Sequence, residues 1–253
     1  MARRFVLRGN APTNAGLANV CWQREEHSEC VESAQREAGW ALRTPRRLCM
    51  MRTRFLINDV HPHSPTPTMI KPFLGATPQY DATNYIAETA VVIGDVTLGA
   101  NASVWHHCTV RGDVNWIRIG AASNVQDNTV VHVTHGSAPT DIGAYVTIGH
   151  GAIIHGCTID DTVLIGMGAT VMDHAQIGSH SIVGAGALVT KGTEVPPRSL
   201  VLGQPATVVR ELTDDEVDTI RPYADNYVRY SAIHDGRETP DANPYYTPRT
   251  DEG

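Results

Sequence analysis

Three histidines, His132, His150 and His155, stand close together in the middle of the chain. A single histidine on an apolar face is usually a packed, hydrogen-bonded side chain, whereas three on a rigid scaffold can converge on one metal ion. Three neutral imidazoles on zinc leave one coordination position for water, whose pKa then falls to about 7. The histidines therefore predict a metal centre, provided that the surrounding elements bring them together.

An aliphatic residue recurs at every sixth position around these histidines. This period fits neither a helix nor a long two-residue alternation. It predicts short strands separated by tight corners, with three sides in a coil of roughly 18 residues. The series consists of Ile86, Val92, Leu98, Val104 and Val110, then Ile119, Val125 and Val131 after a three-residue surplus, and later Ile153, Ile159, Ile165, Val171, Ile177, Val183 and Val189.

The repeat predicts an all-β fold, a parallel β-helix whose aliphatic side chains point into a narrow prism. The stretch from about 80 to 200 supplies some six or seven coils. One coil cannot bury its own apolar face, so stacked coils must supply the core.

The remaining segments differ in character from the repeat. Residues 1–68 carry no six-residue period, and we expect a disordered N-terminal extension there, with an arginine-rich targeting segment as the alternative. We assign 69–205 to the β-helix, 206–233 to a C-terminal helix and 234–253 to a loose tail.

A capping-box pattern marks the start of the expected helix, Thr213-Asp214-Asp215-Glu216. Pro222 should kink this helix. One helical face should pack along the outside of the prism, and its members are Val217, Ile220, Ala224, Tyr227, Val228 and Ser231.

Charge and cysteine content narrow the possible partners and location. The net charge is −7, and residues 69–253 alone hold 10 basic and 21 acidic residues, which argues against binding to nucleic acid or an anionic membrane. The five cysteines show no paired spacing, so a reducing compartment is expected. Without an apolar run of about 18 residues or a signal-peptide core, we predict a cytoplasmic protein.

The repeat also predicts where the histidines lie. If Thr134 to Asp141 form a loop, Val131 and Ile153 stack one coil apart, and His132 and His155 become neighbours. His150 then lies on a different side of the prism. Prisms of this kind can pack in threefold symmetry, so a neighbouring chain could supply this third histidine. The alternative is a metal-free acyltransferase in which His150 is the single catalytic base.

Several motifs resemble those of the γ-class carbonic anhydrases and their close relatives, in order from about Ile70 to Tyr230. The motifs are Trp105, Arg111-Gly112-Asp113, Ile119-Gly120, Asn124-Val125-Gln126-Asp127, Val131-His132, Ile148-Gly149-His150-Gly151, Ile154-His155-Gly156-Cys157 and Ile165-Gly166-Met167-Gly168-Ala169.

The resemblance implies a homotrimer of left-handed β-helices with metal sites at the interfaces. His132 and His155 would come from one protomer and His150 from the next. The implied reaction is the reversible hydration of CO2 to bicarbonate by a metal-bound hydroxide. Three imidazoles suit Zn²⁺, and Fe²⁺ or Co²⁺ would also fit.

The resemblance also implies roles for five other residues, which on their own are typical of surface turns. Gln126 would hydrogen-bond the metal-bound water or CO2, and Asn124 would help to orient it. Arg111 and Asp113 would form a charged pair across the interface, with Asp127 in the same network.

Members of the family that this sequence resembles carry acidic residues that export protons from the site, and this sequence lacks carboxylates at the matching positions. Val114 follows the Arg-Gly-Asp turn, and residues 133–139 contain no carboxylate, which leaves His135 as a candidate proton relay. The other functions that remain open are acyl transfer, metal-dependent thioester hydrolysis, and a non-catalytic structural or accessory trimer. For Cys157, beside His155, we expect a packing role.

Overall fold

A computed structural model describes residues 69–245. The chain divides into the units Met1–Leu56 and Ile57–Gly253, and the first lies wholly outside the described residues. So do the rest of the expected N-terminal extension, up to residue 68, and the end of the expected tail, 246–253.

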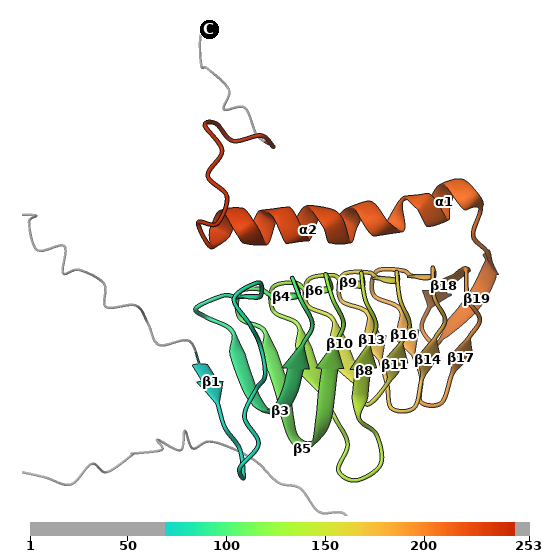
Figure 1. Ribbon diagram of the computed structural model, residues 1–253. Coiled ribbons are helices and arrows are strands. Elements are labelled where there is room, and N and C mark those ends of the chain that lie inside the picture. The colour runs from blue at the N-terminus through green and yellow to red at the C-terminus, as the bar shows by residue number, and fades with distance from the viewer. Residues whose placement is uncertain (1–68, 246–253) are drawn as a thin grey trace, which may run out of the picture. The chain divides into compact units, whose positions relative to one another are not determined.

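The described strands form a parallel β-helix of about seven turns, which confirms the predicted fold class (Figure 1). The first face is built from β3 (Val91–Leu98), β5 (Thr109–Ile119), β7 (Val130–His132), β10 (Ile153–His155), β13 (Thr170–Val171) and β16 (Leu188–Val189).

The long strands β3 and β5 continue around a corner into the second face. That face adds β8 (Thr140–Ile142), β11 (Thr158–Ile159), β14 (Gln176–Ile177) and β17 (Glu194–Val195). The third face contains β2 (Tyr85–Ile86), β4 (Ser103–Val104), β6 (Asn124–Val125), β9 (Thr147–Ile148), β12 (Leu164–Ile165), β15 (Ile182–Val183) and β18 (Ser199–Gly203).

Both ends of the solenoid carry an extra strand. At the first end, β1 (Met69–Lys71) pairs in parallel with β3. At the other end, β19 (Ala206–Glu211) pairs with β18 in the antiparallel direction. The predicted C-terminal helix, 206–233, therefore begins as a strand, which is a correction.

The core consists of the inward-facing aliphatic residues of stacked coils. Val131 and Ile165 are fully buried, as the period predicts. Ile153 is a correction, because 44% of it is exposed and Ile154 takes the inward position opposite Val131. The corner at Gly156, whose φ is +58°, places the next inward residue, Ile159, five rather than six positions after Ile154. Since side chains alternate along a strand, this shift by one residue exchanges the two faces.

The corners depend on residues that accept a left-handed backbone or a close neighbour. His174 and His180 lie at corners with φ near +60°. Gly120 stacks directly against the next coil, where an added Cβ would lie 2.3 Å from the carbonyl carbon of Gly143. No larger side chain fits that position without moving the coils apart.

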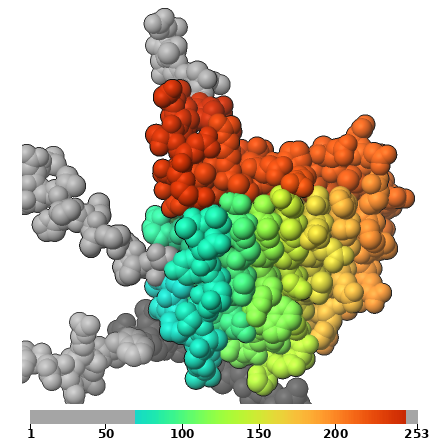
Figure 2. Space-filling model, viewed as in Figure 1, coloured from blue at the N-terminus to red at the C-terminus, as the bar shows by residue number. Residues whose placement is uncertain are grey.

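Two helices follow the solenoid, α1 (Asp214–Asp218) and α2 (Ile220–His234). The predicted capping box is present between Thr213 and Glu216. Because the Pro222 ring is incompatible with the preceding turn of a continuous helix, the break falls at Thr219. The helix α2 runs along the solenoid beside β4 and β6 and covers this side of the molecule (Figures 1 and 2).

The predicted helix face is the one that packs inward. Ile220, Ala224 and Ser231 are buried, and Tyr227 packs against the core. Between residues 69 and 245, no helix is both long and apolar enough to cross a membrane.

Candidate functional site

His132 and His155 lie side by side at the ends of β7 and β10. The parallel register pairs them directly, and Nδ1 of His132 lies 3.1 Å from Nε2 of His155. The two histidines are neighbours because each comes one residue after an inward-facing aliphatic residue, and these two residues, Val131 and Ile154, stack on each other.

A carboxylate holds the other nitrogen of each ring. Asp113 Oδ1 lies 3.1 Å from Nε2 of His132, and Asp173 Oδ1 lies 2.6 Å from Nδ1 of His155. An N–H donated to each carboxylate leaves a lone pair on each of the two nitrogens that face one another. We call Asp113, His132, His155 and Asp173 the first half-site.

Burial and hydrogen bonds shift the pKa of His132 and of the two carboxyl groups beside the histidines. Burial is the largest influence on the pKa of His132 and lowers it, and this effect outweighs the opposing hydrogen bond that His132 donates to Asp113. Burial alone would raise the pKa of Asp113, but hydrogen bonds from Arg111 and His132 hold it below its usual range. For the Asp173 carboxyl, burial is likewise outweighed by hydrogen bonds from His155 and Thr134, so its pKa is also lowered.

The first half-site fits a metal ion in chemistry and in spacing. Two facing lone pairs repel each other unless a cation lies between them. Adjacent ligands on tetrahedral zinc, at bond lengths of roughly 2.0–2.1 Å, lie about 3.3 Å apart. The 3.1 Å between the facing nitrogens is close to that separation.

His150 lies elsewhere, at the corner between β9 and β10. Its Nδ1 is 2.9 Å from Oδ2 of Asp127, and 45% of its side chain is exposed. Gln126 and Asn124 are buried beside this corner, and Gln126 Nε2 donates to Asn124 Oδ1 over 3.1 Å. We call Asn124, Gln126, Asp127 and His150 the second half-site.

The two half-sites are separate within the chain. Across residues 69–245, no side-chain hydrogen bond or ion pair joins one to the other. In the same part of the chain, no three His, Cys, Asp or Glu side chains are grouped so as to hold a metal ion. One chain thus brings together His132 and His155 but not His150.

The charged residues named in the sequence analysis form two separate contacts within this chain. Arg111 pairs with Asp113, two residues away, and the pair across an interface that the resemblance implied stays a prediction. Asp127 does not join that pair in the described chain but contacts His150. The Arg-Gly-Asp turn therefore supplies the carboxylate that orients His132.

Sequence reasoning missed Asp173 and Thr134. Asp173 lies one coil beyond His155, and its Oδ2 accepts a hydrogen bond of 3.0 Å from Thr134 Oγ1. A signal was available, because Asp173 comes two residues after the inward-facing Val171, which pairs with Ile154. Stacking therefore places its carboxylate near His155.

Two other residues considered in the sequence analysis, His135 and Cys157, differ in exposure. His135 is exposed in the loop between β7 and β8, which a bridge between Thr134 and Ala138 closes. Cys157 is buried, and burial raises the pKa of its thiol to about 12. A neutral, buried thiol confirms a packing role for this cysteine.

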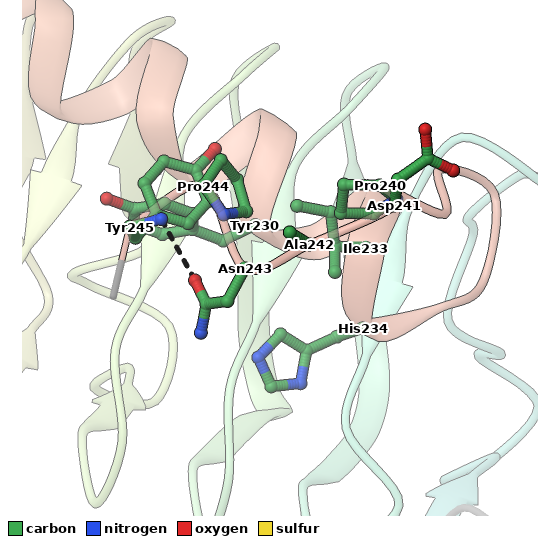
Figure 3. A pocket seen from close by; sticks show the side chains of 9 residues that line it. All are labelled: Tyr230, Ile233, His234, Pro240, Asp241, Ala242, Asn243, Pro244 and Tyr245. Atoms are coloured by element: carbon green, nitrogen blue, oxygen red, sulfur yellow. Dashed lines mark hydrogen bonds between the residues drawn. The ribbon is translucent and has the colours of Figure 1, made fainter. Parts of the chain in front are cut away.

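A cavity of about 510 Å³, lined by no residue of either half-site, lies between the end of α2 and the segment that follows it (Figure 3). The ring of His234 at its edge also contacts Trp105, with 5.0 Å between ring centroids. Its lining consists of Tyr230, Ile233, His234, Pro240, Asp241, Ala242, Asn243, Pro244 and Tyr245, none of which the sequence marked as functional.

Known proteins match the repeat and most of the described chain. The family model "Bacterial transferase hexapeptide (six repeats)" matches residues 156–191. The solved structure of a hexapeptide transferase family protein from Anaplasma phagocytophilum is 41% identical, with a TM-score of 0.62, over 65% of this chain and 96% of that one.

Two curated relatives carry the name of an activity. Gamma carbonic anhydrase 2, mitochondrial, of Arabidopsis thaliana is 44% identical over 62% of this chain, and the match spans only 59% of that relative's length. The probable carbonic anhydrase of Methanocaldococcus jannaschii is 56% identical over 58% of this chain and 91% of its own. The chain therefore belongs to the γ-class carbonic anhydrase family.

Proposed function

We propose that this protein is a metal-dependent carbonic anhydrase, which interconverts CO2 and bicarbonate at sites shared between the protomers of a homotrimer. The observation that carries the proposal is the pair of facing nitrogens on His132 and His155, each backed by a carboxylate. A single chain offers two ligands there, and its remaining candidate, His150, lies in the other half-site.

The exposed surface next to the first half-site supports a contact between chains. Val130 and Ile153 are 40% and 44% exposed, and they lie on the strands that end in His132 and His155. Adjacent exposed aliphatic residues of this kind mark an interaction surface. A contact that joins the first half-site of one chain to the second half-site of the next is head-to-tail, so it closes only in a ring.

In the complete site, His132 and His155 of one chain and His150 of the next would hold the metal. The bound metal would supply Lewis acidity, which lowers the pKa of a coordinated water to about 7. Three imidazoles favour zinc, although Fe²⁺ and Co²⁺ are chemically compatible.

The chain's other residues orient these groups and the substrate. Asp113, Asp127 and Asp173 fix the rings of the three histidines. The bond from Gln126 to Asn124 sets the orientation of the Gln126 amide, whose carbonyl oxygen stays available as an acceptor for a proton-bearing substrate oxygen. Arg111 holds Asp113 in place.

The test is stopped-flow CO2 hydration by protein purified anaerobically and loaded with Zn²⁺, Fe²⁺ or Co²⁺, with elemental analysis of each sample. We expect metal-dependent hydration in the wild type and in the control His180→Ala, whose histidine lies at a distant corner. His155→Ala should lose metal and activity together. Bound metal without hydration in the wild type would contradict the proposal.

The name of the matched transferase structure favours group transfer as the second candidate, and the acyl transfer considered in the sequence analysis is one form of it. That chemistry needs one histidine as a base and leaves the facing pair His132 and His155 without a role. Acetyl transfer from acetyl-coenzyme A that persists in metal-free protein and in His155→Ala would support this candidate.

The cytoplasmic location expected from the cysteines stays a prediction.

A further inference from the structure

Asp173 contacts the segments of both histidines in the first half-site. Its Oδ1 lies 2.6 Å from Nδ1 of His155, and its Oδ2 accepts from Thr134 Oγ1 over 3.0 Å. Thr134 is two residues beyond His132 and begins the loop between β7 and β8. One carboxylate therefore spans the two adjacent coils that carry the histidines.

The surrounding backbone leaves room for this carboxylate. A Cβ added at Gly156 would lie 2.4 Å from Asp173 Oδ1, so only glycine leaves that position open. The Gly156 N–H donates to Thr140 Oγ1 over 2.9 Å, and that hydroxyl donates to the carbonyl of His132 over 2.6 Å. Asp173 thus completes a set of contacts that runs from His155 through the corner to the backbone of His132.

Asp113 and Asp127 act on one histidine each. Asp113 contacts His132 and Arg111, and Asp127 contacts His150. By contrast, Asp173 uses one oxygen for a histidine ring and the other for the neighbouring loop. Its removal should therefore disturb the relative placement of both rings as well as the tautomer of His155.

We propose that Asp173 is a positioning residue that clamps His155 and the loop after His132, so that their two free nitrogens face one metal ion. This inference rests on the proposed function for the identity of the site. It concerns the affinity for the metal, however, and not the reaction that the metal supports.

The affinity test uses the full chain and Zn²⁺ in competition with a chromophoric chelator. Since outer contacts of this kind typically contribute 10- to 100-fold to metal affinity, Asp173→Ala should weaken zinc binding by roughly that factor. Thr134→Val removes only the second contact and should cost less. Asp160→Asn is the matched control, because Asp160 is an exposed aspartate that belongs to neither half-site. This variant should bind zinc as the wild type does.

A second readout needs neither metal nor activity. Imidazole ¹⁵N shifts of the metal-free protein, assigned with His155→Gln, should show His155 protonated at Nδ1 in the wild type and a mixture of tautomers in Asp173→Ala. If Asp173→Ala does not fold, Asp173→Asn carries the test, because the amide keeps the shape but loses the charge.

Zinc affinity of a folded Asp173 variant within twofold of the wild type, or an unchanged His155 tautomer, would overturn the inference. Wild-type protein that binds zinc without hydrating CO2 would instead contradict the proposed function, while weakened zinc binding in Asp173→Ala would still support the clamp. The two failures are therefore distinguishable.

Discussion

The two half-sites of this chain are built in different ways. In the first, His132 and His155 are stacked by the strand register, and their side chains are only 17% and 33% exposed. In the second, His150 stands at a corner with 45% of its side chain exposed and Asp127 as its contact. The first half-site is preorganised within the coil stack, and the second presents a ligand outward. This difference agrees with the proposed site, in which a neighbouring chain would supply the second half-site.

Mixed trimers give the strongest test of whether the two half-sites of one metal site come from different chains. His150→Ala and His155→Ala should each abolish metal binding alone. After co-refolding, about one quarter of the sites would pair an intact first half-site with an intact second one, because each interface draws its two chains at random. Elemental analysis of the separated trimers measures this recovery. Mixed trimers that recover no metal would show that the histidines do not share a site between chains.

The exposed aliphatic residues beside the first half-site should hold the second half-site of the neighbour in place. Val130→Glu with Ile153→Glu puts like charges on adjacent strands of that surface and should give monomers with folded coils and little metal. Analytical ultracentrifugation and elemental analysis test this result. Val209→Glu, at an exposed aliphatic position on β19, is the control and should remain trimeric. A double variant that stays trimeric would place the interface elsewhere.

The register behind the first half-site gives the next largest effect. Ile154→Ala should lower the free energy of unfolding by about 2–5 kcal/mol because it leaves a cavity in the core. Ile153→Ala should change it by only about 0.5 kcal/mol or less, since its side chain faces outward. Urea unfolding of both variants in a Val130→Glu background that analytical ultracentrifugation shows to be monomeric separates folding from assembly. Equal losses for the two variants would contradict the register.

The smallest effect concerns α2 beside the second half-site. Burial is the main cause that raises the pKa of Tyr227 to about 12, and Asp127 adds to it. A raised pKa means that the neutral phenol of Tyr227 stabilises the folded state. Because the unfolded phenol has a pKa of about 10, this contribution to the free energy of unfolding is present below pH 10 and is lost as the pH rises towards 12. Urea unfolding at pH 9 and 11 should therefore show a steeper loss in the wild type than in Tyr227→Phe. The same loss in both would rule out Tyr227 as the cause.

Most of the fold could be predicted from the sequence because the core of a β-helix is a one-dimensional pattern. A period of six gave the coils, and Thr213 with Glu216 gave the start of a helix. The pattern failed where one corner is a residue shorter, at Gly156, so Ile153 was assigned to the core in place of Ile154. It also failed at β19, whose antiparallel pairing with β18 depends on the end of the solenoid and not on any local period.

The candidate site divides along the same line. The sequence by itself determined the repeat, the neighbourhood of His132 and His155, and the separation of His150, because all three depend only on position within a regular coil. Only the tertiary structure decided that Asp113 and Asp173 hold those rings, that Arg111 and Asp113 pair within one chain, and that Asp127 contacts His150. These contacts depend on the directions of side chains at corners and between coils. Residues far apart in the sequence meet there, and the six-residue period does not specify which of them come into contact.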